Sequence, residues 1–315
     1  MKFAFVFPGQ GSQSLGMMAH YGDSPIVRST FDEASAAIGR DLWQLASEGP
    51  ADALNQTVNT QPLMLTAGIA VWRLWLDKGG PLPAMMAGHS LGEYSALVAA
   101  GALDFREAVT LVEFRAAAMQ EAVKAGEGAM AAVLGLDAHR VEAACAAVAG
   151  DQVVEAVNYN DPQQTVIAGH AAAVDRATDA CKEMGAKRAV RLSVSAPFHC
   201  SLMKPAAERL AERLTTVRIS RPTIPVVNNV DVALVSEPAD IASALVRQAA
   251  APVRWVETMQ RMQKEGIVHV IECGPGRVLS KLVKRSADGL AGHAMADDSG
   301  VLGSLTLVTG AGGHV

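Results

Sequence analysis

Short apolar runs that end in glycine-rich turns mark three points along the chain. Residues 3–7 (FAFVF) run into PGQG, residues 84–87 (AMMA) run into GHSLG, and residues 267–271 (IVHVI) are followed closely by GPG. Such runs predict buried strands, and the segments EYSALVAA and VLSKLVKR after the second and third predict helices. Strand, glycine turn and helix form the repeating unit of a parallel α/β sheet, which binds ligands at the carboxyl ends of its strands.

The pattern changes between residues 126 and 195. AMAAVLGL, VVEAVNYN, QTVIAG and KRAVRLSV predict strands, and AHRVEAACAAVA and AAAVDRATDACKEM predict helices. Their order, βαββαβ, is that of a ferredoxin-like module. We therefore expect a ferredoxin-like subdomain at 126–195, inserted into an α/β-hydrolase-like catalytic subdomain made of 1–125 and 196–315.

The C-terminal segment LTLVTGAGGHV, residues 305–315, reads as a strand that runs into a glycine-rich turn. No helix follows it, so it does not complete a dinucleotide-binding motif. We assign it no function.

Composition excludes several classes of protein. Half of the 315 residues are apolar and the net charge is −5, with no long basic run, so nucleic acid is not an expected partner. No apolar run is long enough to span a bilayer, and the first residues lack the features of a secretory signal, so we expect a cytoplasmic location. The four cysteines are widely scattered, which predicts reduced thiols and no metal site.

The motif GHSLG carries the clearest chemical signal. It places Ser90 between a predicted strand and a predicted helix, which is the context of a nucleophile elbow. A sharp turn there would expose the serine oxygen, and the helix N-terminus would favour developing negative charge. The alternative is a Gly-Ser turn that only links strand to helix; the flanking elements favour the nucleophile.

A serine nucleophile needs a base, and His199 in SAPFHC is the best candidate. It lies on a predicted loop, where catalytic side chains are common. Other histidines remain alternatives, although His89 adjoins the serine and cannot normally reach back to its oxygen. The order serine then histidine is that of α/β hydrolases, but no acidic residue between them stands out as the third member of a triad.

Several motifs, taken together and in order, resemble one family. They are FVFPGQGSQ, GHSLGEYSAL, VEFRAAAMQ, SAPFHCSLM, PVVNNVD, VRQ and ECGPG. The chain resembles the malonyl-CoA:acyl carrier protein transacylases of bacterial fatty acid synthesis, from Met1 to about Arg285. The combination is highly specific, although each motif alone is not.

The resemblance implies a role for each matched position. Ser90 would be the nucleophile and His199 its base, oriented by a backbone carbonyl at Gln248 in place of an acid. The backbone N–H groups of Gln10 and Leu91 would form the oxyanion hole, which agrees with one donor following the nucleophile and the other coming from a different loop. Read without Ser90, the Gln10 segment would be only a strand-end turn.

Arg115 would decide the substrate. Alone, LVEFRAAAMQ predicts an amphipathic helix with a solvated arginine. The resemblance implies instead that Arg115 binds the free carboxylate of malonate through a two-pronged pair, which lysine could not reproduce. Phe198 resembles the variant that crowds the alpha carbon and favours malonyl over methylmalonyl. Met119 would line the pocket, with core packing as the alternative.

The expected activity is malonyl transfer from malonyl-CoA to the phosphopantetheine thiol of acyl carrier protein, by a ping-pong cycle through a malonyl-Ser90 ester. We expect no permanently bound cofactor, no metal and a monomer. Two basic clusters could dock an acidic carrier: Lys187, Arg188 and Arg191, or Lys281, Lys284 and Arg285. Either cluster could also be a solvated face. The alternatives to this activity are a discrete polyketide-pathway acyltransferase, a serine thioesterase or esterase, and a noncatalytic binding protein.

Overall fold

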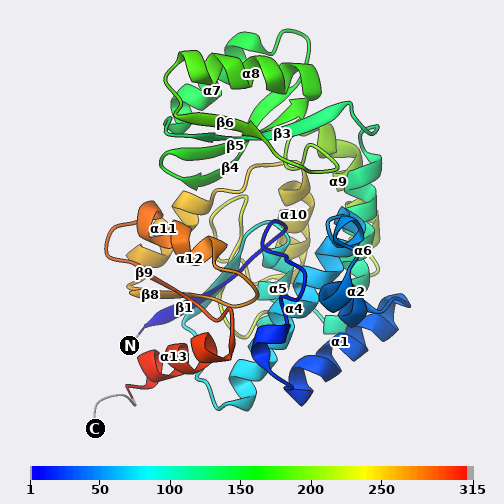
Figure 1. Cartoon of the computed structure of the whole chain (residues 1–315), viewed down its shortest axis with the longest axis vertical. Helices are drawn as coiled ribbons and strands as arrows, with labels where there is room; N and C mark the ends of the chain where they lie inside the picture. The colour runs from blue at the N-terminus through cyan, green and yellow to red at the C-terminus, as the bar shows by residue number, and fades with distance from the viewer. Residues whose placement is uncertain (1, 311–315) are drawn as a thin grey trace.

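The computed structural model describes residues 2–310, which are arranged around two β-sheets (Figure 1). One sheet has five parallel strands in the order β7-β2-β1-β8-β9, and the other has four antiparallel strands in the order β4-β5-β3-β6. The strands of the parallel sheet are β1 (Phe3–Phe7), β2 (Met85–Gly88), β7 (Val226–Val227), β8 (His269–Glu272) and β9 (Ala291–Ala294). The predicted fold class, a parallel α/β sheet with a separate antiparallel module, is confirmed.

The central strand β1 is buried on both faces, which explains its continuous apolar run. Successive side chains point to opposite faces of a sheet. Phe5 therefore packs on one side, with its ring 5.2 Å from that of Trp75 in α4 (Thr57–Asp77). Val6 faces the other side, in the apolar cluster that contains Trp255.

Helices fill the two apolar clusters on either side of the parallel sheet. Besides α4 they are α1 (Pro25–Ile38), α2 (Leu42–Glu48), α3 (Ala51–Leu54), α5 (Gly92–Ala99), α6 (Phe105–Glu121), α9 (Lys204–Leu214), α10 (Pro238–Ala249), α11 (Trp255–Lys264), α12 (Val278–Ser286) and α13 (Asp298–Thr309). Two short 3-10 helices, η1 (Ala19–Tyr21) and η2 (Ser201–Met203), complete the larger subdomain. No helix within residues 2–310 has the length and apolar character needed to cross a membrane.

The smaller subdomain, drawn in green in Figure 1, follows the predicted βαββαβ order. Its elements are β3 (Gly128–Leu134), α7 (Ala138–Val148), β4 (Val154–Asp161), β5 (Gln164–His170), α8 (Ala171–Glu183) and β6 (Arg188–Arg191). The first and third strands lie in the centre of the sheet and both helices pack on one face, as in a ferredoxin-like module. We propose 126–195 as the extent of this insert, with 1–125 and 196–315 forming the catalytic subdomain.

Strand β4 joins the two subdomains. The Tyr159 N–H donates to the Val253 carbonyl oxygen at 3.0 Å, and the Val253 N–H donates to the Val157 carbonyl oxygen at 2.8 Å. An edge of the small sheet is thus hydrogen-bonded to the loop before α11. The small sheet faces the carboxyl ends of β1 and β2, because Met130 and Asn158 line one cavity with Gln10 and Ser90.

The strand predicted near the C-terminus is wrong. Residues 305–309 belong to helix α13, which begins at a cap where the Asp297 side chain accepts from the Gly300 N–H. Val301 and Ser304 are buried on one face of this helix, at helical rather than strand spacing. Residues 305–309 have the sequence LTLVT, whose β-branched and apolar residues resemble a strand when the cap is ignored. The remainder of the predicted turn, residues 311–315, lies outside the described residues.

Candidate active site

Ser90 lies in the sharp turn between β2 and α5. Its φ of 53° falls in the left-handed region, which is uncommon for a residue with a side chain. The turn is so tight that a Cβ on Gly92 would lie only 2.0 Å from the Phe7 carbonyl oxygen. Glycine at position 92 lets α5 start against the end of β1, and the serine oxygen projects from the turn.

His199 meets Ser90 from the loop that follows the small subdomain. Its Nε2 lies 2.6 Å from the Ser90 Oγ, and its Nδ1 lies 2.9 Å from the main-chain oxygen of Gln248 in α10. A carbonyl oxygen can only accept, so Nδ1 carries the proton and Nε2 is free to accept from the hydroxyl. Burial, and next the charge of Arg115, lower the pKa of His199 to about 3, which keeps the imidazole neutral near pH 7.

Gln10 and Leu91 both line the cavity in front of Ser90. Gly9 permits this approach, because a Cβ there would lie 2.5 Å from the His89 carbonyl oxygen and 3.7 Å from the Leu91 nitrogen. The loop after β1 therefore rests directly on the elbow. The side-chain oxygen of Gln10 accepts a hydrogen bond from the Thr57 hydroxyl at 3.0 Å.

Arg115 in α6 is buried, with only 2% of its surface exposed, so it is not the solvated arginine that the helix pattern alone would predict. Its Nη1 donates to Gln61 Oε1 at 2.7 Å, and its Nη2 donates to Gln248 Oε1 at 3.1 Å and to Ser90 Oγ at 3.3 Å. No carboxylate forms an ion pair with Arg115 within residues 2–310. Burial lowers the pKa of Arg115, while the neighbouring Tyr94 and Glu93 oppose that change.

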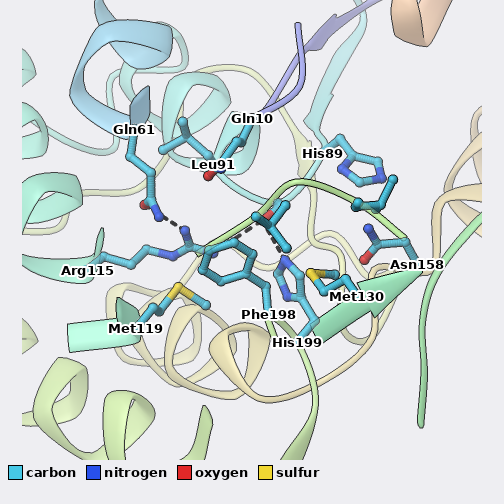
Figure 2. A pocket seen from close by; sticks show the side chains of 13 residues that line it. Gln10, Gln61, His89, Leu91, Arg115, Met119, Met130, Asn158, Phe198 and His199 are labelled. Atoms are coloured by element: carbon cyan, nitrogen blue, oxygen red, sulfur yellow. Dashed lines mark hydrogen bonds between the residues drawn. The ribbon is translucent and has the colours of Figure 1, made fainter. Parts of the chain in front are cut away.

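The three predicted groups converge on one cavity, shown in Figure 2. Ser90, His199 and Arg115 line it together with Phe198 and Met119, and its volume is about 100 Å³. Pockets for drug-sized ligands usually measure about 300 to 1,000 Å³, so this smaller space suits a short acyl group. Residues on the small-subdomain side of the cavity are Met130, Asn158, Leu192 and Val194.

Sequence reasoning missed two polar residues of the cavity. Gln61 in α4 accepts a hydrogen bond from Arg115 and is 2% exposed. A polar residue within a predominantly apolar helix could have indicated a functional position. Asn158 lines the cavity from β4, and its buried Oδ1 has no hydrogen-bond partner in the described part of the chain. Nothing near position 158 in the sequence indicated this role.

His89 is turned away from the Ser90 oxygen, as its position next to the elbow predicted. Its Nε2 lies 2.8 Å from Asn160 Oδ1, and its ring packs near Trp255. The four cysteines are all unpaired and buried. Among residues 2–310, no group of three or more His, Cys, Asp or Glu side chains is placed to hold a metal ion.

Comparison with known proteins places this site in a family. The acyl transferase domain family matches residues 4–305. Malonyl CoA-acyl carrier protein transacylase from Salmonella typhimurium is 54% identical over 306 residues, which cover 97% of this chain and 99% of the relative. The protein of the same name from Escherichia coli K12 is 54% identical over 307 residues, at the same coverage. The chain belongs to the malonyl-CoA:acyl carrier protein transacylase family.

Solved structures of family members share the whole fold. The crystal structure of acyl-carrier-protein S-malonyltransferase from Burkholderia pseudomallei has a TM-score of 0.96 at 57% identity, covering 97% of this chain and all of that one. A malonyl-transacylase in complex with a type II PKS acyl-carrier protein has a TM-score of 0.96 at 51% identity, covering 98% of this chain and all of that one. The family match runs to residue 305, so the likeness does not end near Arg285 as the motifs suggested.

Proposed function

We propose that this chain transfers a malonyl group from malonyl-CoA to the phosphopantetheine thiol of acyl carrier protein, and so supplies fatty acid synthesis. One observation carries the proposal: a serine, a neutral histidine and a buried arginine line the same small cavity. The names of the family members support the substrate and the carrier. The transfer is expected to take place in the cytoplasm, on a monomeric enzyme.

The first half-reaction forms an ester on Ser90. His199 Nε2 takes the hydroxyl proton as Oγ attacks the thioester carbonyl carbon of malonyl-CoA. The negative charge on the carbonyl oxygen is stabilised by the N–H groups of Gln10 and Leu91. The intermediate collapses, the carbon–sulfur bond breaks, and coenzyme A leaves as a thiol with the proton held by His199.

The second half-reaction reverses these steps with a different thiol. His199 takes the proton of the phosphopantetheine thiol, and the sulfur attacks the malonyl ester carbonyl. The carbon–oxygen bond to Ser90 then breaks, and Oγ recovers the proton. The serine ester itself carries the acyl group, so the cycle needs no resident cofactor or metal.

Arg115 selects the malonyl group through its free carboxylate. The buried Arg115 Nε has no hydrogen-bond partner among residues 2–310, so a carboxylate would satisfy an otherwise costly donor. Phe198 and Met119 border the same cavity, and we expect Phe198 to limit the room at the alpha carbon of the acyl group. Both features favour malonyl over acetyl and methylmalonyl groups.

Intact-protein mass spectrometry tests the proposal. Wild-type protein mixed with malonyl-CoA should gain the mass of one malonyl group, and the adduct should disappear when a carrier protein with free phosphopantetheine is added. Ser90→Ala should gain no mass. A wild type that stays unmodified, or an adduct that persists in Ser90→Ala, would refute the mechanism.

A second candidate is a polyketide-pathway acyltransferase, because the malonyl-transacylase of one related structure is bound to a type II PKS acyl-carrier protein. Transfer rates to fatty acid and polyketide carriers, measured side by side, separate the two. A thioesterase would instead lose the malonyl group to water without a carrier. The lifetime of the isolated adduct in buffer decides between transfer and hydrolysis.

A further inference from the structure

Behind the nucleophile, a buried carboxyl group meets two residues that hold the reacting groups. This group is Glu93, which lies one helical turn after Ser90 in α5 and is 2% exposed. It is not among the described residues that line the cavity. Glu93 therefore does not face the substrate, and it contacts the site through hydrogen bonds to two neighbouring residues.

The first neighbour, Asn229, brackets the strained turn at Ser90. Asn229 is fully buried, and its Oδ1 accepts a hydrogen bond from the Ser90 N–H at 2.7 Å. Its Nδ2 donates to the Gly88 carbonyl oxygen at 2.7 Å. One side chain thus holds the backbone on both sides of His89. These two hydrogen bonds help to maintain the left-handed conformation of Ser90.

The second neighbour, Gln248, forms hydrogen bonds to three residues of the site, His199, Arg115 and Ser90. Its main-chain oxygen accepts from His199 Nδ1 at 2.9 Å. Its side-chain Oε1 accepts from Arg115 Nη2 at 3.1 Å, and its Nε2 donates to the Ser90 carbonyl oxygen at 2.9 Å. The direction of this amide decides whether Arg115 meets an acceptor or a donor.

Glu93 links these two neighbours through a single oxygen. Its Oε2 accepts from the Asn229 N–H and from Gln248 Nε2, both at 2.9 Å. Gln248 Nε2 donates to two acceptors, Glu93 Oε2 and the Ser90 carbonyl oxygen, which fixes the orientation of the amide. If the amide were flipped, its NH₂ group would face the Arg115 Nη2 donor. Burial raises the pKa of Glu93 to about 7, but Oε2 accepts in either state, since a proton can reside on the other oxygen.

We propose that Glu93 is a positioning residue for acyl transfer: its Oε2 fixes Asn229 and Gln248, and through them the turn at Ser90, the imidazole of His199 and the guanidinium of Arg115. The inference rests on the proposed malonyl transfer. It differs from a purely structural role in one respect. Loss of the acceptor should change the chemistry and the substrate preference of molecules that are correctly folded.

Two variants test this role. Glu93→Met has a similar length but no acceptor, so it should lower kcat/KM for malonyl-CoA by about 10- to 100-fold and reduce the preference for malonyl over acetyl. Glu93→Gln keeps a carbonyl oxygen at the same reach and should stay within about threefold of wild type. Adduct formation on Ser90 is measured with both acyl-CoAs and expressed per folded molecule, together with the melting temperature.

A matched control is Glu272, a fully buried carboxyl group in β8 that accepts from the N–H groups of Val278, Leu279 and Ser280. Glu272→Met should lower the melting temperature and leave the kinetics of the folded enzyme and its preference unchanged. If Glu93→Met behaves in the same way, the positioning role is wrong.

If Glu93→Met does not fold, Glu93→Asp is tested in its place. A loss of kcat/KM and of malonyl preference supports the positioning role, and a lower melting temperature alone contradicts it. This variant keeps the carboxyl group but withdraws it by one methylene, so that it cannot reach both neighbours. A wild type that forms no malonyl ester would contradict the proposed function instead, which keeps the two failures distinct.

Discussion

The oxygen of Ser90 is shared by a base and a cation. His199 Nε2 lies 2.6 Å from it and Arg115 Nη2 lies 3.3 Å from it. The cation stabilises negative charge that develops on the oxygen, and it also helps to keep the imidazole unprotonated. A malonyl carboxylate that neutralises Arg115 would weaken this repulsion and make His199 a stronger base as the substrate binds.

Replacement of Arg115 tests the carboxylate interaction. Arg115→Ala should lower kcat/KM for malonyl-CoA by about 30-fold to several thousand-fold, which corresponds to roughly 2 to 5 kcal/mol for one partner of a buried charged pair. Acetyl-CoA has no carboxylate, so its transfer should fall far less. Both rates are measured by adduct formation on Ser90.

Arg115→Lys serves as the companion variant. It keeps the charge but not the two-pronged geometry, so it should recover only part of the malonyl rate. Equal losses for malonyl and acetyl transfer in Arg115→Ala would dismiss the carboxylate interaction.

At this scale the sequence predicted those groups that sit in recognisable motifs. Ser90, His199, Arg115 and the carbonyl of Gln248 meet in space as the motifs suggested. Gln61 and the contacts of Glu93 were not predicted. Gln61 and Arg115 are 54 residues apart in the sequence, and Glu93 and Gln248 are 155 residues apart. Local sequence patterns cannot predict contacts between residues so far apart.

Among the elements, β4 supports the loop that carries His199. Glu155 in β4 accepts from the Ser201 N–H at 2.9 Å and from the Ser201 hydroxyl at 2.6 Å. His199 lies two positions before Ser201 and has a φ of 66°. Like Ser90, it is therefore held in the left-handed region. A strand of the small subdomain thereby fixes a loop of the large one.

Removal of this support should slow the reaction. Glu155→Ala should lower kcat by about 3- to 10-fold with little change in KM, because the hydrogen bonds to Ser201 are lost at a partly solvated site. Glu142→Ala, which removes an exposed carboxylate from α7 of the same subdomain, is the control. Steady-state kinetics of malonyl transfer give both constants, and an unchanged kcat in Glu155→Ala would argue against the support.

Strands with long apolar runs were predictable, and the less regular elements were not. β1, β2 and β8 lie where the apolar runs placed them, and the βαββαβ order is confirmed. β9 has the sequence AGHA, which has neither bulk nor alternation, and it is held at the sheet edge by pairing with β8. Tertiary pairing rather than local preference forms this strand, so the sequence pattern could not predict it.

For the whole molecule, one residue from each of the two predicted basic clusters lines a common groove. Lys187 of the first and Arg285 of the second line one groove of about 390 Å³ beside the end of β3. Lys281 and Lys284 line a different hollow, against α13. Leu134 borders the groove and Met130 borders the active-site cavity, four residues apart on β3, or about 13 Å along the strand.

A carrier docked at this groove should show strong electrostatic control. Transfer to an acidic carrier should slow steeply as salt rises, and the double change Lys187→Glu with Arg285→Glu should flatten that dependence. Loading from malonyl-CoA, which needs no carrier, should change much less. Lys182→Glu, on α8 of the small subdomain, is the control.

Stopped-flow transfer at several ionic strengths provides the measurement. A wild-type rate that does not respond to salt would rule out this docking, as would an equal effect of Lys182→Glu.

The backbone bonds between β4 and the segment before α11 have a consequence for how substrates arrive. An outward rotation of the small subdomain would break the hydrogen bonds that link Tyr159 and Val157 to Val253, each of which contributes about 0.5 to 1.5 kcal/mol net. Hinge opening is therefore disfavoured. The long, thin arms of coenzyme A and of the carrier protein would then reach Ser90 without a hinge motion, so the shape of the cavity in front of Ser90, rather than the timing of a closing lid, would limit what can enter.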